Sequence, residues 1–189
     1  MVRDLILSNR SCRRFGEGFV VERRTLEELV DLARLSASAA NLQPLKYILS
    51  CDAQKNARIF PHVAWAAYLK DWGGPAPGER PSAYLIILGD TAISETFGCD
   101  HGIAAQSILL GAREKGLAGC MIGLIQREEL RQELNIPTQY EILLVLALGK
   151  PREQAVIDEV GPNGDIKYWR DSNGVHHVPK RPLRELIID

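Results

Sequence analysis

The sequence lacks the local motifs of three large enzyme classes. It contains no Gly-x-Ser-x-Gly, no Gly-x-x-x-x-Gly-Lys and no Gly-x-Gly-x-x-Gly after a strand-like run. These motifs place the nucleophile of many hydrolases, cradle nucleotide phosphates and hold dinucleotides. Hydrolase, nucleotidase and Rossmann-type interpretations therefore have no local support, and a bound cofactor would have to supply the reactivity.

Long apolar runs and a strong net charge are absent as well. No apolar run approaches the roughly 20 residues that a membrane-spanning helix needs, and the start, with Arg3 and Asp4 before three apolar residues, is not typical of a signal peptide. The formal net charge of -1, with 25% charged residues, gives no large field for nucleic acid or a membrane surface. We therefore expect a cytoplasmic protein whose partners are small molecules, and neither nucleic acid nor membrane.

Spacings typical of metal sites are also missing. The two adjacent histidines, His176 and His177, have no Cys, Asp or Glu at ligand spacing, so we expect them to be solvent-exposed and expect no metal. The cysteines form no close pair, which leaves a zinc site or a thioredoxin-type motif unsupported. We expect four reduced, mostly buried thiols: Cys12, Cys51, Cys99 and Cys120.

One uncharged stretch, residues 99–123, dominates the sequence. From residue 101 to residue 112 no side chain carries a formal charge, and apolar residues occur in every direction around a helix turning about 100° per residue. This pattern predicts a helix buried on all sides and closed by Gly116 in a left-handed conformation. The apolar residues between Gly119 and Gly123 then predict a short buried strand.

The rest of the chain predicts further helices and strands in one domain. Thr25 and Glu28 have the spacing of a capping box before an apolar face, which predicts a helix ending near Ser36. The length of 189 residues, without repeats, favours a single domain. The other predicted elements are strands at 46–51, 84–88 and 142–148, short helices at 4–9, 53–60, 64–72 and 127–134, a surface loop at 72–81, and turns without a core of their own after 151.

Two groups of side chains are candidates for binding a ligand. Arg10, Ser11 and Arg13 combine guanidinium forks with a hydroxyl, which is the donor set of a phosphate site, although surface arginines commonly form such clusters. Asn41 and Gln43 offer amide groups to the edge of a heteroaromatic ring, although an asparagine before a strand is more often a turn residue. The residues alone leave both interpretations open.

Four separated motifs, in order, resemble those of the nitroreductase family of flavoproteins. The family opens with Arg-Arg-Ser-x-Arg-x-Phe, and residues 9–15 are Asn-Arg-Ser-Cys-Arg-Arg-Phe. Its Ala-Pro-Ser-x-x-Asn-x-Gln-Pro-Trp segment is matched by residues 36–45, in which Ala37 and Leu45 replace the proline and the tryptophan. Residues 116–123, Gly-Leu-Ala-Gly-Cys-Met-Ile-Gly, correspond to Gly-Leu-Gly-x-Cys-x-Ile-Gly, and residues 180–183, Lys-Arg-Pro-Leu, resemble the closing Lys-Arg-x-Pro-Leu region.

The resemblance implies an α+β fold in which helices surround a mixed sheet. The long buried helix would lie at the interface of a homodimer, and FMN would bind at that interface. The chain would form one domain, residues 1–189, whose C-terminal tail, from about residue 152 to residue 189, extends onto the partner subunit.

The resemblance also implies a set of FMN-binding residues and no catalytic side chain, because the flavin would carry the reaction. Arg10, Ser11 and Arg13 would hold the phosphate together with Lys180 or Arg181. Ser38 and Asn41 would meet the edge of the flavin, and the backbone near Ile122 and Gly123 would approach its ring. The complete expected set is Arg10, Ser11, Arg13, Ser38, Ala39, Asn41, Met121, Ile122, Gly123, Lys180 and Arg181.

The implied activity is the reduction of nitroaromatics, quinones or related small acceptors by NADH or NADPH through FMN. A single pocket serving donor and acceptor in turn would give a ping-pong, two-electron mechanism. The sequence leaves two alternatives open. One is a specialised relative, such as a flavin-dependent dehalogenase or ring oxidase, and the other is a flavin-binding module without catalysis.

Overall fold

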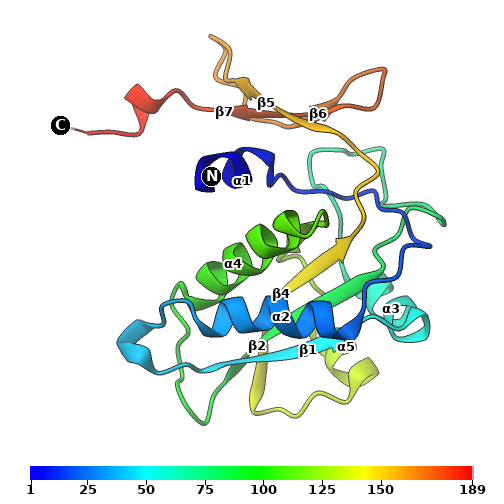
Figure 1. Ribbon diagram of the computed structural model, residues 1–189, viewed down its shortest axis with the longest axis vertical. Coiled ribbons are helices and arrows are strands. Elements are labelled where there is room, and N and C mark those ends of the chain that lie inside the picture. Colours follow the sequence, from blue (N-terminus) through cyan, green and yellow to red (C-terminus); the bar gives the residue numbers. More distant parts are fainter. Residues whose placement is uncertain (189) are drawn as a thin grey trace.

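The computed structural model describes residues 1–188, which are organised around a four-stranded sheet (Figure 1). Its strands are β1 (Leu45–Ser50), β2 (Ala83–Asp90), β3 (Ala118–Ile122) and β4 (Tyr140–Gly149), in the order β1-β2-β4-β3. Every neighbouring pair is antiparallel. The α+β class is confirmed, while the mixed pairing expected from the sequence occurs in a second, smaller sheet.

Helices cover both faces of the main sheet, which is why β2 is buried along its whole length. Even-numbered apolar residues of β2 pack with α3 (Ala53–Ile59) and α5 (Arg127–Leu134). Odd-numbered residues of β2 pack with α2 (Arg23–Arg34) and α4 (Asp100–Glu114). Successive side chains of a strand point to opposite faces, so an uninterrupted apolar run predicts burial on both sides.

Helix α4 is the helix predicted from the uncharged stretch, and it ends before Gly116, whose φ is +70°. Gly111 lets α2 approach closely, because a Cβ at that position would lie 2.2 Å from Leu32 Cδ1. In the single chain, however, α4 is not buried on all sides, since Gly102 and Gln106 are exposed and Leu110 is half-buried. Between residues 101 and 112 this open side carries no formal charge.

The C-terminal tail forms a three-stranded sheet that the turn-rich sequence did not predict. β5 (Ala155–Glu159) pairs in parallel with β7 (His176–Lys180), and β6 (Trp169–Arg170) pairs antiparallel with β7. Figure 1 shows this sheet on the far side of α1 (Val2–Ser8) from α4. The tail therefore packs against the N-terminal segment and builds one wall of a cavity there.

Two local predictions are wrong. The capping box does not form, because α2 begins at Arg23 and its Glu28 pairs with Lys115 (2.6 Å) instead of reaching back to the helix start. Residues 64–72 are not a helix. The segment begins extended, because Val63 bridges Ile125 and the Ala64 N–H donates to the Leu124 carbonyl (3.0 Å). It then continues in turns, with the Leu69 N–H bonded to the Ala66 carbonyl (2.8 Å) and the Trp72 N–H to the Leu69 carbonyl (3.0 Å).

Three short 3-10 turns complete the described chain: Ala39–Asn41, Phe60–His62 and Leu183–Glu185. Within residues 1–188, no helix combines the length and the apolar character that crossing a membrane requires.

Candidate functional site

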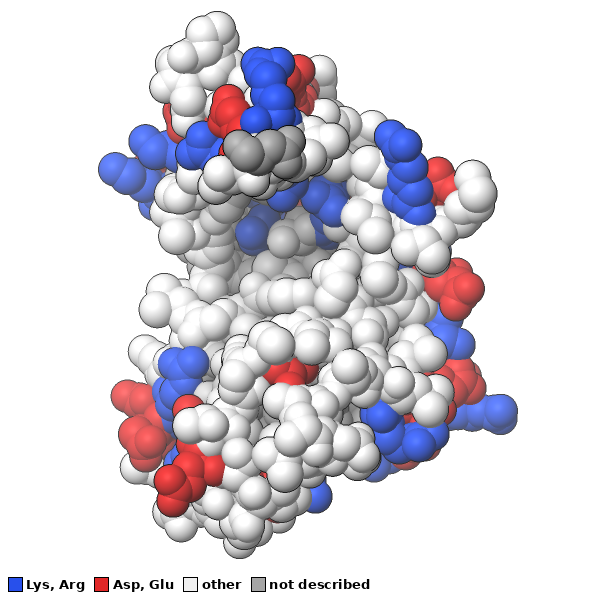
Figure 2. Space-filling view, turned by 90° about the vertical axis from the view of Figure 1, so that its left-hand side faces the viewer, with Lys and Arg blue, Asp and Glu red and all other residues white. Residues whose placement is uncertain are grey.

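A basic cavity of about 300 Å³ lies where the N-terminal segment, α4, β3 and the tail sheet meet. Figure 2 shows a face of the molecule that is hollowed, with Lys and Arg side chains inside the hollow. The four elements come from distant parts of the chain, so only the complete fold assembles this cavity. We call it the basic cavity; its lining residues are Asn9, Arg10, Ser11, Arg13, Gln106, Leu109, Met121, Tyr168, His176, Val178 and Lys180.

Arg13 is the most buried cation of the basic cavity, with only 8% of its surface exposed. Its Nη1 donates to Nε2 of His176 (3.2 Å), and its guanidinium lies over the Tyr168 ring, 4.8 Å from the centroid. Both partners belong to the tail. Because His176 bonds the edge of the guanidinium and Tyr168 lies on its face, Arg13 is fixed before any ligand arrives, which lowers the entropy cost of binding an anion.

His176 is 1% exposed, so the prediction that both histidines are solvated is wrong. Burial is the main reason that the pKa of His176 falls to about 4, and the charge of Arg13 lowers it further. An arginine can only donate, so Nε2 of His176 accepts and Nδ1 carries the proton. That Nδ1 is buried without a hydrogen-bond partner among the described residues. His177 is also largely covered, because its ring stacks on Trp169 and Nδ1 lies 2.8 Å from Asp158 Oδ2.

Arg10 is tied to the first helix, because its Nη2 donates to the Ile6 carbonyl (2.6 Å). Its Nε is buried and has no partner within residues 1–188, and burial lowers the pKa of the guanidinium. Lys180 and Ser11 lie at the same cavity. Three cations and a hydroxyl thus converge on one space, which is the donor set that oxyanions require.

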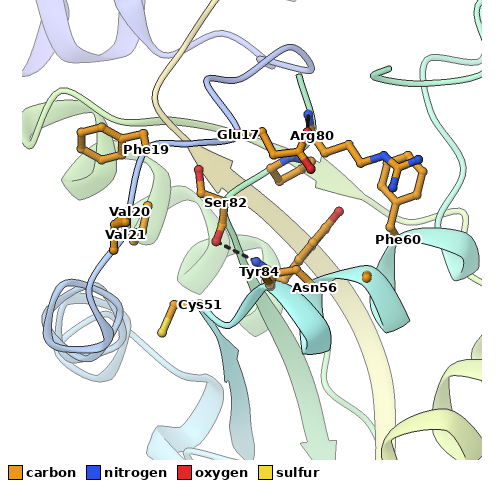
Figure 3. Close-up of a pocket in the computed structure, with 13 residues that line it drawn as sticks. Glu17, Phe19, Val20, Val21, Cys51, Asn56, Phe60, Arg80, Ser82 and Tyr84 are labelled. Atoms are coloured by element: carbon orange, nitrogen blue, oxygen red, sulfur yellow. Dashed lines mark hydrogen bonds between the residues drawn. The ribbon is translucent and has the colours of Figure 1, made fainter. Parts of the chain in front are cut away.

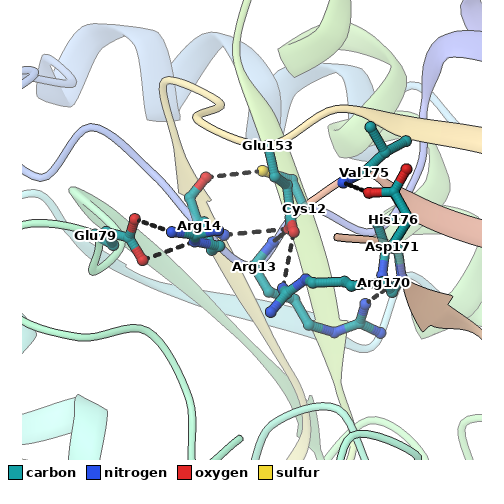
Figure 4. Close-up of polar contacts among 9 residues, drawn as sticks. All are labelled: Cys12, Arg13, Arg14, Glu79, Glu153, Arg170, Asp171, Val175 and His176. Carbon is teal, nitrogen blue, oxygen red and sulfur yellow. Dashed lines mark hydrogen bonds and ion pairs between the residues drawn. The ribbon is translucent and has the colours of Figure 1, made fainter. Parts of the chain in front are cut away.

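The Glu153 carboxylate holds the backbone of the segment that carries Arg13 and Arg14 (Figure 4). Its side chain is 1% exposed, accepts hydrogen bonds from the backbone N–H groups of Arg13 and Arg14, and forms an ion pair with Arg170 (2.8 Å). Since Arg170 lies in β6 and Glu153 precedes β5, this one carboxylate joins the tail to the N-terminal motif. A buried carboxylate with three partners of this kind positions the segment that carries Arg13.

Arg14 points to the other side of the same segment. Its Nε and Nη2 donate to Glu79 Oε2 (2.7 Å) and Oε1 (2.5 Å), a bidentate pair that lowers the pKa of Glu79 (Figure 4). Arg14 is therefore a structural arginine that holds the 72–81 loop, while Arg13 faces the basic cavity.

The cysteines beside this segment are unreactive thiols. Burial is the main cause that raises the pKa of Cys12 to about 12 and the pKa of Cys120 as well. A thiol nucleophile needs its thiolate, so neither group is suited to covalent chemistry at neutral pH. All four cysteines are free; Cys51 is half-buried and Cys99 exposed, so the expectation of mostly buried thiols holds fully for two of them.

A second hollow, of about 170 Å³, contains Ser38 and lies elsewhere on α4. The Ser38 hydroxyl donates to Asp100 Oδ2 (2.6 Å), and the Ala39 N–H donates to Asp100 Oδ1 (3.0 Å). Asp100 and Ala104 of α4 line this hollow, whereas Gln106 and Leu109 line the basic cavity. Nine residues at about 100° each place Leu109 roughly half a turn from Asp100, so the two hollows lie on opposite sides of α4.

The loop that follows Ser38 is held in a sparsely populated backbone conformation. Ala40, Asn41 and Gln43 have φ values of 49°, 54° and 52°. Left-handed conformations cost free energy for residues with a side chain, and they persist where surrounding contacts impose them. Here the two bonds to Asp100, and the Gln43 N–H donating to the Ser38 hydroxyl (2.9 Å), impose the shape. The backbone N–H and carbonyl of Asn41 are themselves bonded within the loop, so the group that the loop presents is the exposed side-chain amide of Asn41.

The structure brings only part of the expected set together. Arg10, Ser11, Arg13, Met121 and Lys180 share the basic cavity, with Met121 37% exposed. The other residues lie outside it. Ser38 borders the second hollow, Ala39 and Asn41 are exposed, Ile122 is buried in the core, Gly123 is exposed, and Arg181 pairs with Glu185 (3.4 Å).

Sequence reasoning did not find Glu153, Tyr168 or His176. Each acts on the N-terminal motif from about 140 or more positions away along the chain, and no local spacing marks such a contact. The adjacent histidines stand out in the sequence, but their spacing carries a signal only for or against a metal. Gln106 and Leu109 were part of the predicted helix, yet the side that faces the cavity depends on how the tail folds.

Comparison with known proteins agrees with this architecture. The model of the Nitroreductase family matches residues 6–150. An oxygen-insensitive NADPH nitroreductase of Helicobacter pylori is 25% identical, over 78% of this chain and 86% of its own. Two solved structures share the fold. They are an FMN-dependent nitroreductase of Clostridium difficile (TM-score 0.65, 23% identity, 82% of this chain and 89% of that one) and an NADPH:FMN oxidoreductase of Vibrio harveyi in complex with NAD+ (TM-score 0.62, 21% identity, 79% and 68%).

The region that the family model covers contains the N-terminal motif, the 36–45 segment, α4 and β3, and it ends before the tail. It spans well over half of the chain, and the fold is the one found in the solved relatives. The chain belongs to the nitroreductase family.

Proposed function

We propose that this protein is an FMN-dependent oxidoreductase that uses NADH or NADPH to reduce small acceptors such as nitroaromatics or quinones. The family assignment supports the reaction class, and two of the solved relatives are described as FMN-dependent or as an FMN oxidoreductase. The observation that carries the proposal is the basic cavity, where Arg10, Arg13 and Lys180 converge beside the Ser11 hydroxyl.

The residues of the basic cavity fit the phosphate end of FMN. Two buried donors, Nε of Arg10 and Nδ1 of His176, have no partner among the described residues, and a phosphate oxygen is the kind of acceptor that would satisfy them. The positive charge of the site is also available to a ligand, because the nearby carboxylate, Glu153, is turned toward backbone N–H groups and Arg170. The cavity thus supports binding of one terminal phosphate.

FMN, when bound, would supply the redox chemistry by taking a hydride from the reduced nicotinamide and passing two electrons to the acceptor. The chain would bind, orient and exclude water. The phosphate would be held by Arg10, Ser11, Arg13 and Lys180, and apolar contact would come from Leu109 and Met121. The loop at 38–43, whose backbone is already in place, would offer the side-chain amide of Asn41. No side chain is assigned the role of a catalytic acid or base.

We further propose that the protein acts as a homodimer. The two hollows lie on opposite sides of α4, so one chain does not present the basic cavity and the loop at 38–43 to one flavin. A second copy packed on the uncharged open side of α4, around Gly102 and Gln106, would bring a loop from one chain beside the cavity of the other. An extension of the tail onto the partner is part of the same proposal.

Steady-state kinetics test the enzyme assignment against the alternatives. We expect NAD(P)H oxidation that depends on added quinone or nitroaromatic, with parallel initial-rate lines when both substrates are varied, because one pocket serves them in turn. Intersecting lines would contradict the shared pocket. Flavin that the nicotinamide does not reduce anaerobically would favour a binding module. Turnover only with a halogenated substrate, which is released without its halogen, or with a substrate whose ring becomes oxidised, would favour a specialised relative. The cytoplasmic location expected from the sequence stays a prediction.

A further inference from the structure

A third space, a cavity of about 180 Å³, lies outside the basic cavity and the Ser38 hollow and shares no lining residue with either (Figure 3). It lies between residues 17–21, the start of α3 and the start of β2. We call it the Tyr84 cavity. Nothing in the proposed function uses it.

The Tyr84 hydroxyl is the first sign that this cavity takes a ligand. Tyr84 is 1% exposed, and its hydroxyl has no hydrogen-bond partner among the described residues. Figure 3 shows it directed toward the side of the cavity where Phe60 and Arg80 lie. Burial raises the pKa of Tyr84, so the group remains an O–H donor. An unpaired buried hydroxyl is costly, and a ligand acceptor would remove that cost.

Arg80 supplies the second free donor. Its guanidinium lies over the Phe60 ring, 4.2 Å from the centroid, so the charge is held in place by an aromatic face. The Arg80 Nε is buried and has no partner within residues 1–188. A planar guanidinium in a fixed position recognises planar oxyanions, above all carboxylates.

Two other polar side chains of the Tyr84 cavity, Asn56 and Glu17, are bonded within the chain. Asn56 Nδ2 donates to the Ser82 carbonyl (2.7 Å), and its Oδ1 accepts from the Ser50 hydroxyl (2.7 Å). Glu17 Oε2 accepts from the backbone N–H groups of Gly78 and Arg80, which turns this carboxylate toward the 72–81 loop. Among the described residues that line the cavity, the buried polar atoms without a partner are therefore two donors, the Tyr84 hydroxyl and the Arg80 Nε, one of them cationic.

The remaining walls are apolar and set the size of the ligand. They come mainly from Phe19, Val21, Ala57 and Phe60. A cavity of about 150 Å³ with apolar walls accommodates one benzene ring, so about 180 Å³ leaves room for a ring with one small substituent. We propose that the Tyr84 cavity binds a small monocyclic carboxylate, with its ring against the apolar walls and its carboxylate bonded by Tyr84 and Arg80.

Benzoate titrated into the purified protein tests the proposal, with amide chemical shifts recorded by NMR. We expect saturable shifts at Val21, Ala53 and Ala57. Tyr84→Phe and Arg80→Gln should each weaken binding about tenfold or more, the order expected for a hydrogen bond to a charged group. Benzamide, of the same shape without the charge, should also bind about tenfold more weakly. Matched controls, Tyr140→Phe and Arg58→Gln, remove the same groups outside the cavity and should leave benzoate affinity unchanged.

Three results would overturn the proposal. They are no saturable shift at the cavity residues, an unchanged affinity in Tyr84→Phe and Arg80→Gln, or shifts confined to residues 9–13 and 176–180, which would place benzoate in the basic cavity. The Tyr84→Phe variant should fold, because the hydroxyl that it loses has no partner. A lower melting temperature of ligand-free Tyr84→Phe would show that the hydroxyl is already bonded in the free protein, and would also count against the site. FMN content is independent of every one of these readouts, so failure here leaves the proposed function untouched.

Discussion

Arg13→Glu should lower the affinity for FMN at least about 100-fold and yield a colourless protein. The change replaces a fixed cation of the basic cavity with an anion facing the phosphate, so a charge-assisted hydrogen bond becomes a repulsion. Binding is measured by the quenching of flavin fluorescence on titration of the apoprotein. The buried position of Arg13, between Tyr168 and His176, means that the tail should loosen as well, which thermal unfolding would show as a lower melting temperature.

Two further variants separate binding from folding. Arg13→Gln keeps a donor without the charge, so it should weaken FMN less than Arg13→Glu while retaining more of the melting temperature. Arg181→Glu makes the same charge reversal outside the basic cavity, beside Glu185, and should change FMN affinity less than about threefold. Equal losses in Arg13→Glu and Arg181→Glu would mean that only the general charge matters, and retention of FMN in Arg13→Glu would place the phosphate elsewhere.

Glu153→Ala should lower the free energy of unfolding by about 3 kcal/mol and release FMN. The variant leaves Arg170 and two backbone N–H groups buried without their acceptor, and removing one member of a buried ion pair typically costs about 3–5 kcal/mol. The segment that carries Arg13 then loses the contact that fixes it. Denaturant unfolding measures the first effect and flavin fluorescence the second.

Glu159→Ala is the matched control for Glu153→Ala. Glu159 is an exposed glutamate of the same tail, and its loss should change the unfolding free energy by less than about 0.5 kcal/mol. If Glu153→Ala retained wild-type stability and FMN affinity, the carboxylate would not position the N-terminal motif. A loss of FMN with unchanged stability would place the effect in the cavity alone.

The fold was largely predictable because its strongest signals are local. The uncharged run of α4, the apolar runs of β2 and β4, and the helix at 127–134 each carry enough pattern in a few residues to specify the element. The tail sheet was missed for the opposite reason. Its strands are short and half-exposed, and 16 residues, β6 among them, separate β5 from its partner β7. Neither β5 nor β7 has the apolar alternation that is typical of a strand.

The site was predictable only as far as its motifs reach. Arg10, Ser11, Arg13 and Lys180 were found by resemblance, and the structure brings them to one cavity. Ser38 shows where motif matching stops. Its hydroxyl is engaged by Asp100 in this chain, and its hollow lies half a turn away around α4, so its expected contact with the flavin depends on a second copy. Distances between segments far apart in the chain are set by packing, which no short pattern encodes.

Sedimentation velocity, recorded at the absorption bands of protein and of flavin together, tests the central claim most directly. We expect one boundary of dimer size that carries FMN, because the basic cavity binds the phosphate and a second copy completes the site. The flavin should move with the protein at every point of the boundary. A colourless boundary from protein that takes up no added FMN, or a flavin-loaded boundary of monomer size at micromolar concentration, would contradict it.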